Sequence, residues 1–317
     1  MDDDPEIAAL FARQHGLATR AQLYELGLTR AALRWRLGRS WRAVAGPVVS
    51  SSPQRLSPRQ RVVAAQLLAG RYGVVSGDHA VLLHGLAAGR GHRPVQVLVP
   101  MNQGSRSVAF VRITRTRRPV ERPHHDGLLR LAPLPRAVVD TARWASTLDH
   151  ARSVVIEAVQ TGRADLDDLQ HELDAGPRRG SALARRAIAD ARAGAWSAPE
   201  AAMLESLATS AVLPPVVANP VLTVAGRRLL SPDGWIDDVA LALMVHSRRH
   251  HERGADWEAT VEDDGELTAH GVTVLAFTPR SIAVQPERVL HRVERTYLEL
   301  KRSGRRRPAV VMTPRSG

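Results

Sequence analysis

Short amphipathic patterns, each ended by a glycine, fill the first 55 residues. Apolar positions recur every three or four residues in three segments, which predicts three helices. A threonine precedes the second and the third segment, where its hydroxyl can cap a helix. The helices are expected at 6–15, 20–26 and 30–37, the caps at Thr19 and Thr29, and two strands within 41–49. This order of three helices and a hairpin predicts a winged helix-turn-helix domain over residues 1–55.

The region from 56 to 190 mixes helix and strand patterns, with helices in the majority. Ser57 caps a helix that begins with proline and reaches Ala69. His79 and His84 are five residues apart, so packing or capping is a better interpretation than metal binding. Strands are expected at 95–99 and 108–114, helices at 79–86, 134–144, 149–161 and 165–173, and a turn at 124–126.

A domain boundary is predicted near residue 190, after which strand patterns return. The run from Val239 to Val245 is short, apolar and partly β-branched, so a buried strand is favoured over a helix. Its side chains alternate between two faces, one with Leu241, Leu243 and Val245 and the other with Ala242, Met244, His246 and Arg248. The second face becomes polar toward its end, as where a strand leaves a core for a cleft. Further helices are expected at 181–193, 256–270 and 286–300, a strand at 272–277, and a disordered basic tail at 301–317.

Composition adds a strong positive charge to this picture. The chain has 44 Lys and Arg against 32 Asp and Glu, a net charge of +12. Arginine binds phosphate in a bidentate way, so double-stranded DNA is the leading partner. A GC-rich genome would explain a preference for arginine, but it would not explain the excess over acidic residues.

Three absences limit the function classes. With no cysteine, disulfides and cysteine-based zinc sites are excluded. No apolar run reaches the length of a membrane span, so no membrane partner is expected. The acidic N-terminus is unlike a signal peptide, and we expect a cytoplasmic, nucleoid-associated protein.

The third predicted helix carries the candidate DNA-binding residues. Arg30 and Arg34 are four residues apart and share one helix face, which could enter a major groove. A solvated helix face is the alternative. The candidates are Thr29, Arg30, Arg34, Arg36, Arg39 and Arg42.

These segments resemble a known family. Residues 14–23 (QHGLATRAQL), 27–33 (GLTRAAL) and 41–48 resemble the N-terminal winged-helix domain of AbiEi-type antitoxins of type IV toxin–antitoxin systems. Residues 75–80 and 83–86 also fit, so the resemblance covers about 5–90. It implies binding to inverted repeats in the protein's own promoter, and it raises a cognate toxin or a homodimer as further partners.

A second resemblance covers about residues 194–300. Residues 197–200 (SAPE), 232–235 (PDGW), 239–248, 256–260 (DWEAT) and 268–279 resemble, in order and spacing, a C-terminal domain of actinobacterial proteins related to very-short-patch-repair endonucleases. The resemblance implies a PD-(D/E)XK nuclease-like domain. Such nucleases hold Mg²⁺ with two carboxylates, and a lysine or another polar residue two positions on helps to activate water.

The chain departs from that family at the metal site. Asp233 matches the first carboxylate and Glu200 a helix glutamate, but Met244 and His246 stand at the other two positions. A thioether is a poor ligand for Mg²⁺. We therefore expect no catalytic residues and no cofactor, with Mg²⁺ required only if the chain is an active nuclease. A transition-metal site of Asp233, His246 and His250 is a less favoured alternative that needs a helix from Val245.

The predicted fold class is α+β or α/β. It comprises a winged helix-turn-helix (1–55), a mixed, mostly helical region (56–190), a restriction-endonuclease-like mixed sheet flanked by helices (191–300) and the tail. Three functions remain open: a DNA-binding regulator with a decayed nuclease-like domain, an active endonuclease of the very-short-patch-repair type, and an antitoxin that neutralises a toxin through residues 60–190.

Overall fold

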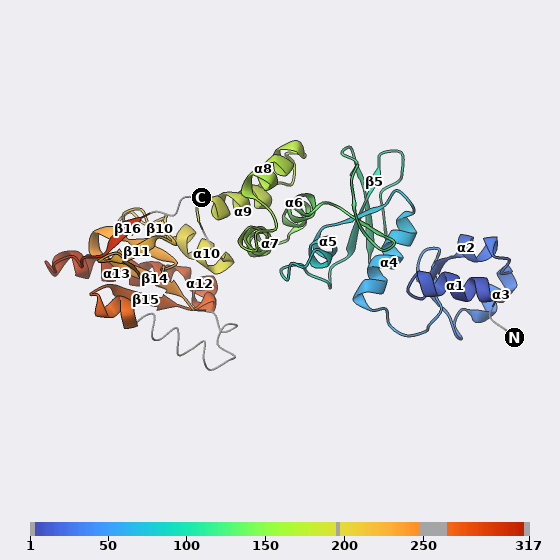
Figure 1. Cartoon of the computed structure of the whole chain (residues 1–317), viewed down its shortest axis with the longest axis horizontal. Helices are drawn as coiled ribbons and strands as arrows, with labels where there is room; N and C mark the ends of the chain where they lie inside the picture. The colour runs from blue at the N-terminus through green and yellow to red at the C-terminus, as the bar shows by residue number, and fades with distance from the viewer. Residues whose placement is uncertain (1–3, 195–196, 247–264, 314–317) are drawn as a thin grey trace. The chain divides into compact units, whose positions relative to one another are not determined.

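The computed structural model describes residues 4–194, 197–246 and 265–313. The chain forms two compact units, residues 1–145 with 162–182 and residues 146–161 with 183–317 (Figure 1). The units do not separate at a single point in the sequence, because residues 146–161 pack with the second unit. The fold class is mixed α and β, as predicted. None of the helices in the described ranges is long and apolar enough to span a membrane.

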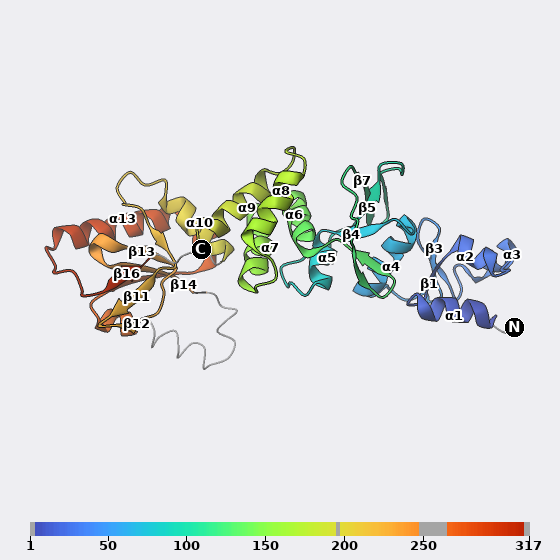
Figure 2. The ribbon, with the colours of Figure 1, turned by 45° about the horizontal axis from the view of Figure 1, so that its top comes forward.

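The first unit begins with three helices and a small antiparallel sheet of strand order β1-β3-β2 (Figure 2). The elements are α1 (Pro5–Arg13), β1 (Leu17–Thr19), α2 (Arg20–Glu25), α3 (Arg30–Arg36), β2 (Arg42–Ala45) and β3 (Val48–Ser50). Their core contains Leu23, Leu33 and Phe11, whose ring meets Trp41 edge-on at 4.9 Å. The three predicted helices and the hairpin are confirmed, and β1 is an addition.

The predicted caps hold these helices in place. Thr19 Oγ1 accepts from Gln22 N, and the Gln22 side chain accepts from Thr19 N, which forms a capping box at α2. Thr29 Oγ1 accepts from Ala32 N at 3.1 Å at the start of α3. Each hydroxyl satisfies a helix amide that has no partner within its own helix.

A six-stranded mixed sheet of order β6-β7-β5-β4-β9-β8 fills the rest of the first unit. Its strands are β4 (Val74–Ser76), β5 (Val95–Pro100), β6 (Arg106–Val108), β7 (Val111–Thr116), β8 (His124–Asp126) and β9 (Leu129–Leu131). Its helices are α4 (Pro58–Ala69), α5 (Asp78–Leu83), α6 (Leu134–Trp144) and α8 (Leu166–Ala175).

One prediction for this region is wrong. The expected turn at 124–126 is the edge strand β8. Four of the six strands have only three residues, which is too short for a period-two pattern to stand out in the sequence. Arg59 also holds β8 through a bidentate ion pair with Asp126, in which both N···O distances are 2.9 Å.

The second unit contains a four-stranded sheet, β10-β13-β14-β15, in which only β14 and β15 are parallel. The strands are β10 (Val217–Ala218), β13 (Gly234–Ile236), β14 (Leu241–Val245) and β15 (Thr273–Phe277). The helices of this unit within the described ranges include α7 (Leu148–Gln160), α9 (Ala182–Arg192), α10 (Ala198–Leu207), α12 (Pro279–Val284) and α13 (Pro286–Arg302). The predicted alternation in β14 is confirmed, because Leu241 and Leu243 enter one core and Ala242 enters another.

A second sheet of this unit corrects the prediction of a disordered tail. Its strands are β11 (Val221–Val224), β12 (Arg227–Arg228) and β16 (Val311–Thr313). Lys301 lies within α13, β16 pairs with β11, and Val310 is 4% exposed. Arg305 donates to the carbonyl of Gly271 at 2.6 Å. The tail prediction weighed its arginines and overlooked the apolar residues 309–312, which supply the strand.

Candidate functional site

The exposed face of α3 carries two arginines. Arg30 and Arg34 are both exposed, and neither side chain forms an ion pair or hydrogen bond with any described residue. They lie four positions apart on one helix face; Arg30 directly follows the N-cap Thr29, and Arg34 lies in the last turn. Arginine in this state offers several N–H donors to an acceptor outside the protein. The face is therefore suited to an anionic surface.

The remaining candidates near α3 are held more closely. The Arg36 guanidinium lies 5.3 Å from the centre of the Trp41 ring, and Arg39 lies 5.1 Å from that of Trp35. Arg39 also donates to the Trp35 carbonyl at 2.9 Å. Arg42 is partly buried on β2. Sequence reasoning missed Trp35, which is 52% exposed beside Arg34 and is an aromatic platform that Arg39 orients.

The predicted nuclease-like residues gather at the β13–β14 pair. Asp233 precedes β13, and its Oδ2 accepts from Val245 N at the end of β14 at 2.5 Å. The antiparallel register pairs Gly234 with Leu243, so its continuation sets Asp233 opposite Met244. Met244 is 7% exposed. The position opposite the aspartate therefore holds a buried thioether.

Asn219 contacts the Glu200 side chain and the Asp233 backbone, and it was not predicted. Its Nδ2 donates to Glu200 Oε2 at 3.2 Å and to the Gly194 carbonyl at 2.8 Å, and its backbone N donates to the Asp233 carbonyl at 3.4 Å. Asn219 is 2% exposed and has a positive φ of 44°. Asparagine tolerates that conformation better than most residues, and the following Pro220 is the sequence signal of a turn that could have drawn attention to it.

Both carboxylates accept hydrogen bonds from within the protein. Glu200 accepts from the Asn219 side-chain amide, and Asp233 accepts from the Val245 backbone amide. Within the described ranges, no three His, Cys, Asp or Glu side chains are grouped so that they could hold a metal ion. A hard cation needs several oxygen ligands, and Met244 cannot supply one.

The alternative metal site rested on a helix that begins at Val245, and Val245 belongs to a strand instead. Val245 ends β14, and His246 N donates to the Phe277 carbonyl at 2.9 Å beside the parallel partner strand. The premise that the chain turns helical at Val245 is therefore wrong. His250, the third proposed ligand, lies outside the described residues.

His79 and His84 are packing residues, as predicted. His79 is 3% exposed, and His84 Nε2 lies 2.9 Å from the Ala132 carbonyl. Burial lowers the pKa of His84. Burial also lowers the pKa of His79, and the nearby charge of Arg61 lowers it further. Both rings therefore favour the neutral form.

The buried His79 predicts a loss of stability in acid. The unfolded ring binds a proton below about pH 6.5, whereas the folded ring does so only at lower pH. The free energy of unfolding should therefore fall as pH drops from about 6.5 toward the folded pKa, by at most about 1.4 kcal/mol per pH unit. Urea unfolding at pH 7.5 and 5.5 should show a smaller difference for His79→Gln than for the native chain. The exposed His171→Gln is the control, and an equal effect of the two variants would contradict the prediction.

No family model matches the sequence, and no curated protein shows significant similarity to it.

Proposed function

We propose that the protein is a DNA-binding transcriptional regulator that contacts duplex DNA through α3 and the β2–β3 hairpin. The observation that carries the proposal is the exposed pair Arg30 and Arg34 on a capped helix, free of partners within the described residues. The element order helix, strand, helix, helix, strand, strand is that of a winged helix-turn-helix, whose third helix enters the major groove. The net charge of +12 favours a polyanionic partner.

The target of this regulator is proposed to lie near its own gene, as the resemblance to AbiEi-type antitoxins implies. The test is recovery of bound fragments when the full-length protein is mixed with sheared DNA of its own genome at physiological salt. We expect strong enrichment of a few segments, one of them an inverted repeat upstream of the gene. Uniform recovery of all fragments would reject sequence-specific regulation and leave only general DNA affinity.

The second unit is proposed to be a nuclease-like domain that no longer hydrolyses DNA. Helix α10, the antiparallel β10, β13 and β14, and the parallel β15 follow the order of the PD-(D/E)XK core, which supports this assignment. Asp233 lies opposite Met244 in the continued strand register, and its carboxylate accepts from the Val245 amide. Water activation by Mg²⁺ requires a second hard ligand at that place.

Plasmid cleavage distinguishes the inactive domain from the endonuclease alternative. If the domain is inactive, highly purified protein with Mg²⁺ or Mn²⁺ should leave supercoiled plasmid intact over hours, because Met244 replaces the second carboxylate. The matched control is Asp233→Ala, assayed in parallel. Nicking by the native chain that is lost in Asp233→Ala would favour the endonuclease. Nicking retained in the variant would indicate another site or a contaminant.

A further inference from the structure

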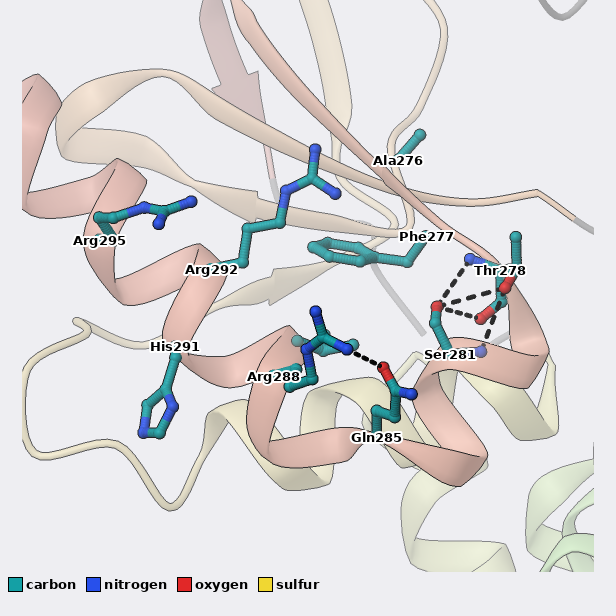
Figure 3. A pocket seen from close by; sticks show the side chains of 10 residues that line it. Ala276, Phe277, Thr278, Ser281, Gln285, Arg288, His291, Arg292 and Arg295 are labelled. Carbon is teal, nitrogen blue, oxygen red and sulfur yellow. Dashed lines mark hydrogen bonds between the residues drawn. The ribbon is translucent and has the colours of Figure 1, made fainter.

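A basic hollow of about 530 Å³ lies in the second unit at the end of β15 (Figure 3). Its described lining comes from β15, α12 and α13, and these described residues include three arginines and one histidine but no carboxylate. The side chains that concern the argument are Phe277, Gln285, Arg288, His291, Arg292 and Arg295. The proposed DNA interface on α3 does not involve this hollow.

The arginines form one stripe along α13. Arg288, Arg292 and Arg295 lie at positions i, i+4 and i+7, which fall on one helix face. A neighbouring face of the helix is buried through Val289 and Val293, so the helix is fixed against the sheet core. The stripe is therefore held on a rigid element, as a binding site requires.

The positive charge of the stripe is largely uncompensated. Arg288 Nη1 donates to the neutral Gln285 side chain at 3.0 Å, and the Arg292 guanidinium lies 5.6 Å from the centre of the Phe277 ring. Figure 3 places these two arginines on either side of that ring in the view drawn. Arg295 reaches a carboxylate, Glu299, at 3.9 Å, and both side chains are mostly exposed. Such a pair contributes little, so the hollow keeps its positive charge.

The nearest acidic residues on α13 do not cancel this charge. Glu294 accepts from Ser210 Oγ at 2.5 Å and is thereby directed to the loop after α10. Glu287 is exposed in the first turn of the helix and is absent from the lining of the hollow. The bond of Arg288 to Gln285 occupies only part of its donors, and the remaining N–H groups of Arg288 and Arg292 can donate to an anion.

We propose that this stripe binds the phosphate backbone of a nucleic-acid strand, as a second contact separate from α3. The stripe spans seven residues of helix, about 10 Å at a rise of about 1.5 Å per residue. A single phosphate is much smaller than this length, whereas the phosphates of one duplex strand recur about every 3.4 Å along the helix axis. Several arginines in a row therefore match a strand better than a lone anion.

The test measures the salt dependence of DNA binding in the full-length chain. Binding of a random-sequence duplex and of its single strand is followed by fluorescence anisotropy for the native protein and for Arg288→Ala/Arg292→Ala. Each lost phosphate contact should reduce the log–log salt slope by about 0.9 on duplex and about 0.7 on single strand. We expect the slope to fall by the amount that corresponds to one or two lost contacts, and Arg288→Lys/Arg292→Lys should restore most of the slope.

A matched control removes the same charge elsewhere in the unit. Arg228 and Arg306 are exposed and form no ion pair with any described residue, so Arg228→Ala/Arg306→Ala should leave the slope unchanged. Circular dichroism and thermal unfolding check that all variants are folded. An equal slope loss in the control would mean that only total charge matters, and an unchanged slope in Arg288→Ala/Arg292→Ala would also overturn the proposal.

The same measurements in an Arg30→Ala/Arg34→Ala background separate this proposal from the regulator proposal. If Arg30→Ala/Arg34→Ala retains DNA affinity and the addition of Arg288→Ala/Arg292→Ala removes it, the stripe binds DNA even if α3 does not. If Arg30→Ala/Arg34→Ala loses DNA affinity and the stripe substitutions cause no further loss, the stripe proposal is overturned and the regulator proposal remains. Full displacement of DNA by an equal concentration of inorganic pyrophosphate would indicate a small phosphate ligand and overturn the strand assignment.

Discussion

Alanine in place of Arg34 should weaken binding to the enriched duplex by about 1–3 kcal/mol, roughly 5- to 150-fold in Kd, if the guanidinium contacts a base edge. Arg30→Ala should have an effect of the same order, because both residues are exposed on one face of α3. Isothermal titration or anisotropy at fixed salt measures the change. A base contact lowers affinity for the enriched site more than for random duplex, whereas a phosphate contact lowers both equally and reduces the salt slope.

The matched control for this prediction is Arg13→Ala. Arg13 is an exposed arginine on α1 of the same helical bundle, and it forms no ion pair with any described residue. Its removal takes away the same charge without touching α3. If Arg13→Ala weakens binding as much as Arg34→Ala does, the α3 face has no special role and the proposed interface is wrong.

The whole chain is the appropriate material for this experiment. A fragment ending near residue 90 contains every element of the proposed interface, and sequence reasoning favours it for that reason. However, β4 is an inner strand of the six-stranded sheet, between β5 and β9, and both partners follow residue 90. Such a fragment would expose the unpaired edges of β4 and the apolar side of α4.

Local chemistry explains which parts of the fold could be predicted. Thr19, Thr29 and Ser57 cap their helices through atoms three residues away, and such short-range signals are visible in the sequence. The alternation in β14 is equally local, and it placed Met244 and Ala242 on the face opposite Leu243. The helices that begin at these caps and the strand β14 were therefore predicted correctly.

Long-range pairing explains why β16 and the role of Asn219 were not predicted from the sequence. Strand β16 is ordered because Leu222 of β11 pairs with Met312, and the two residues are far apart in the sequence. The contacts of the candidate site are also long-range, since Asn219 connects Glu200 on a helix with Asp233 on a hairpin. A single sequence contains no sign of which distant segments meet, and arginines that dock onto carbonyls look like arginines in a disordered tail.

Arg152 is another feature that only the fold reveals, and it predicts the largest change in stability. Its side chain is 2% exposed, and its Nε donates to Asp190 at 2.7 Å while a terminal nitrogen donates to Glu205 at 2.5 Å. These contacts join α7, α9 and α10. Asp190→Ala removes one partner of a buried charge, so it should lower the free energy of unfolding by about 3 kcal/mol. Urea unfolding followed by circular dichroism measures the loss.

Arg186 provides the matched control for Asp190→Ala. Its side chain is 47% exposed and contacts the same two carboxylates, at 3.0 Å and 3.1 Å. Because solvent screens an exposed pair, Arg186→Ala should cost less than about 1 kcal/mol. The double variant Arg152→Met/Asp190→Leu should be more stable than Asp190→Ala, since it leaves no buried charge without its partner. Equal losses for Asp190→Ala and Arg186→Ala would mean that Arg152 reaches water in solution, and the buried-charge explanation would then be wrong.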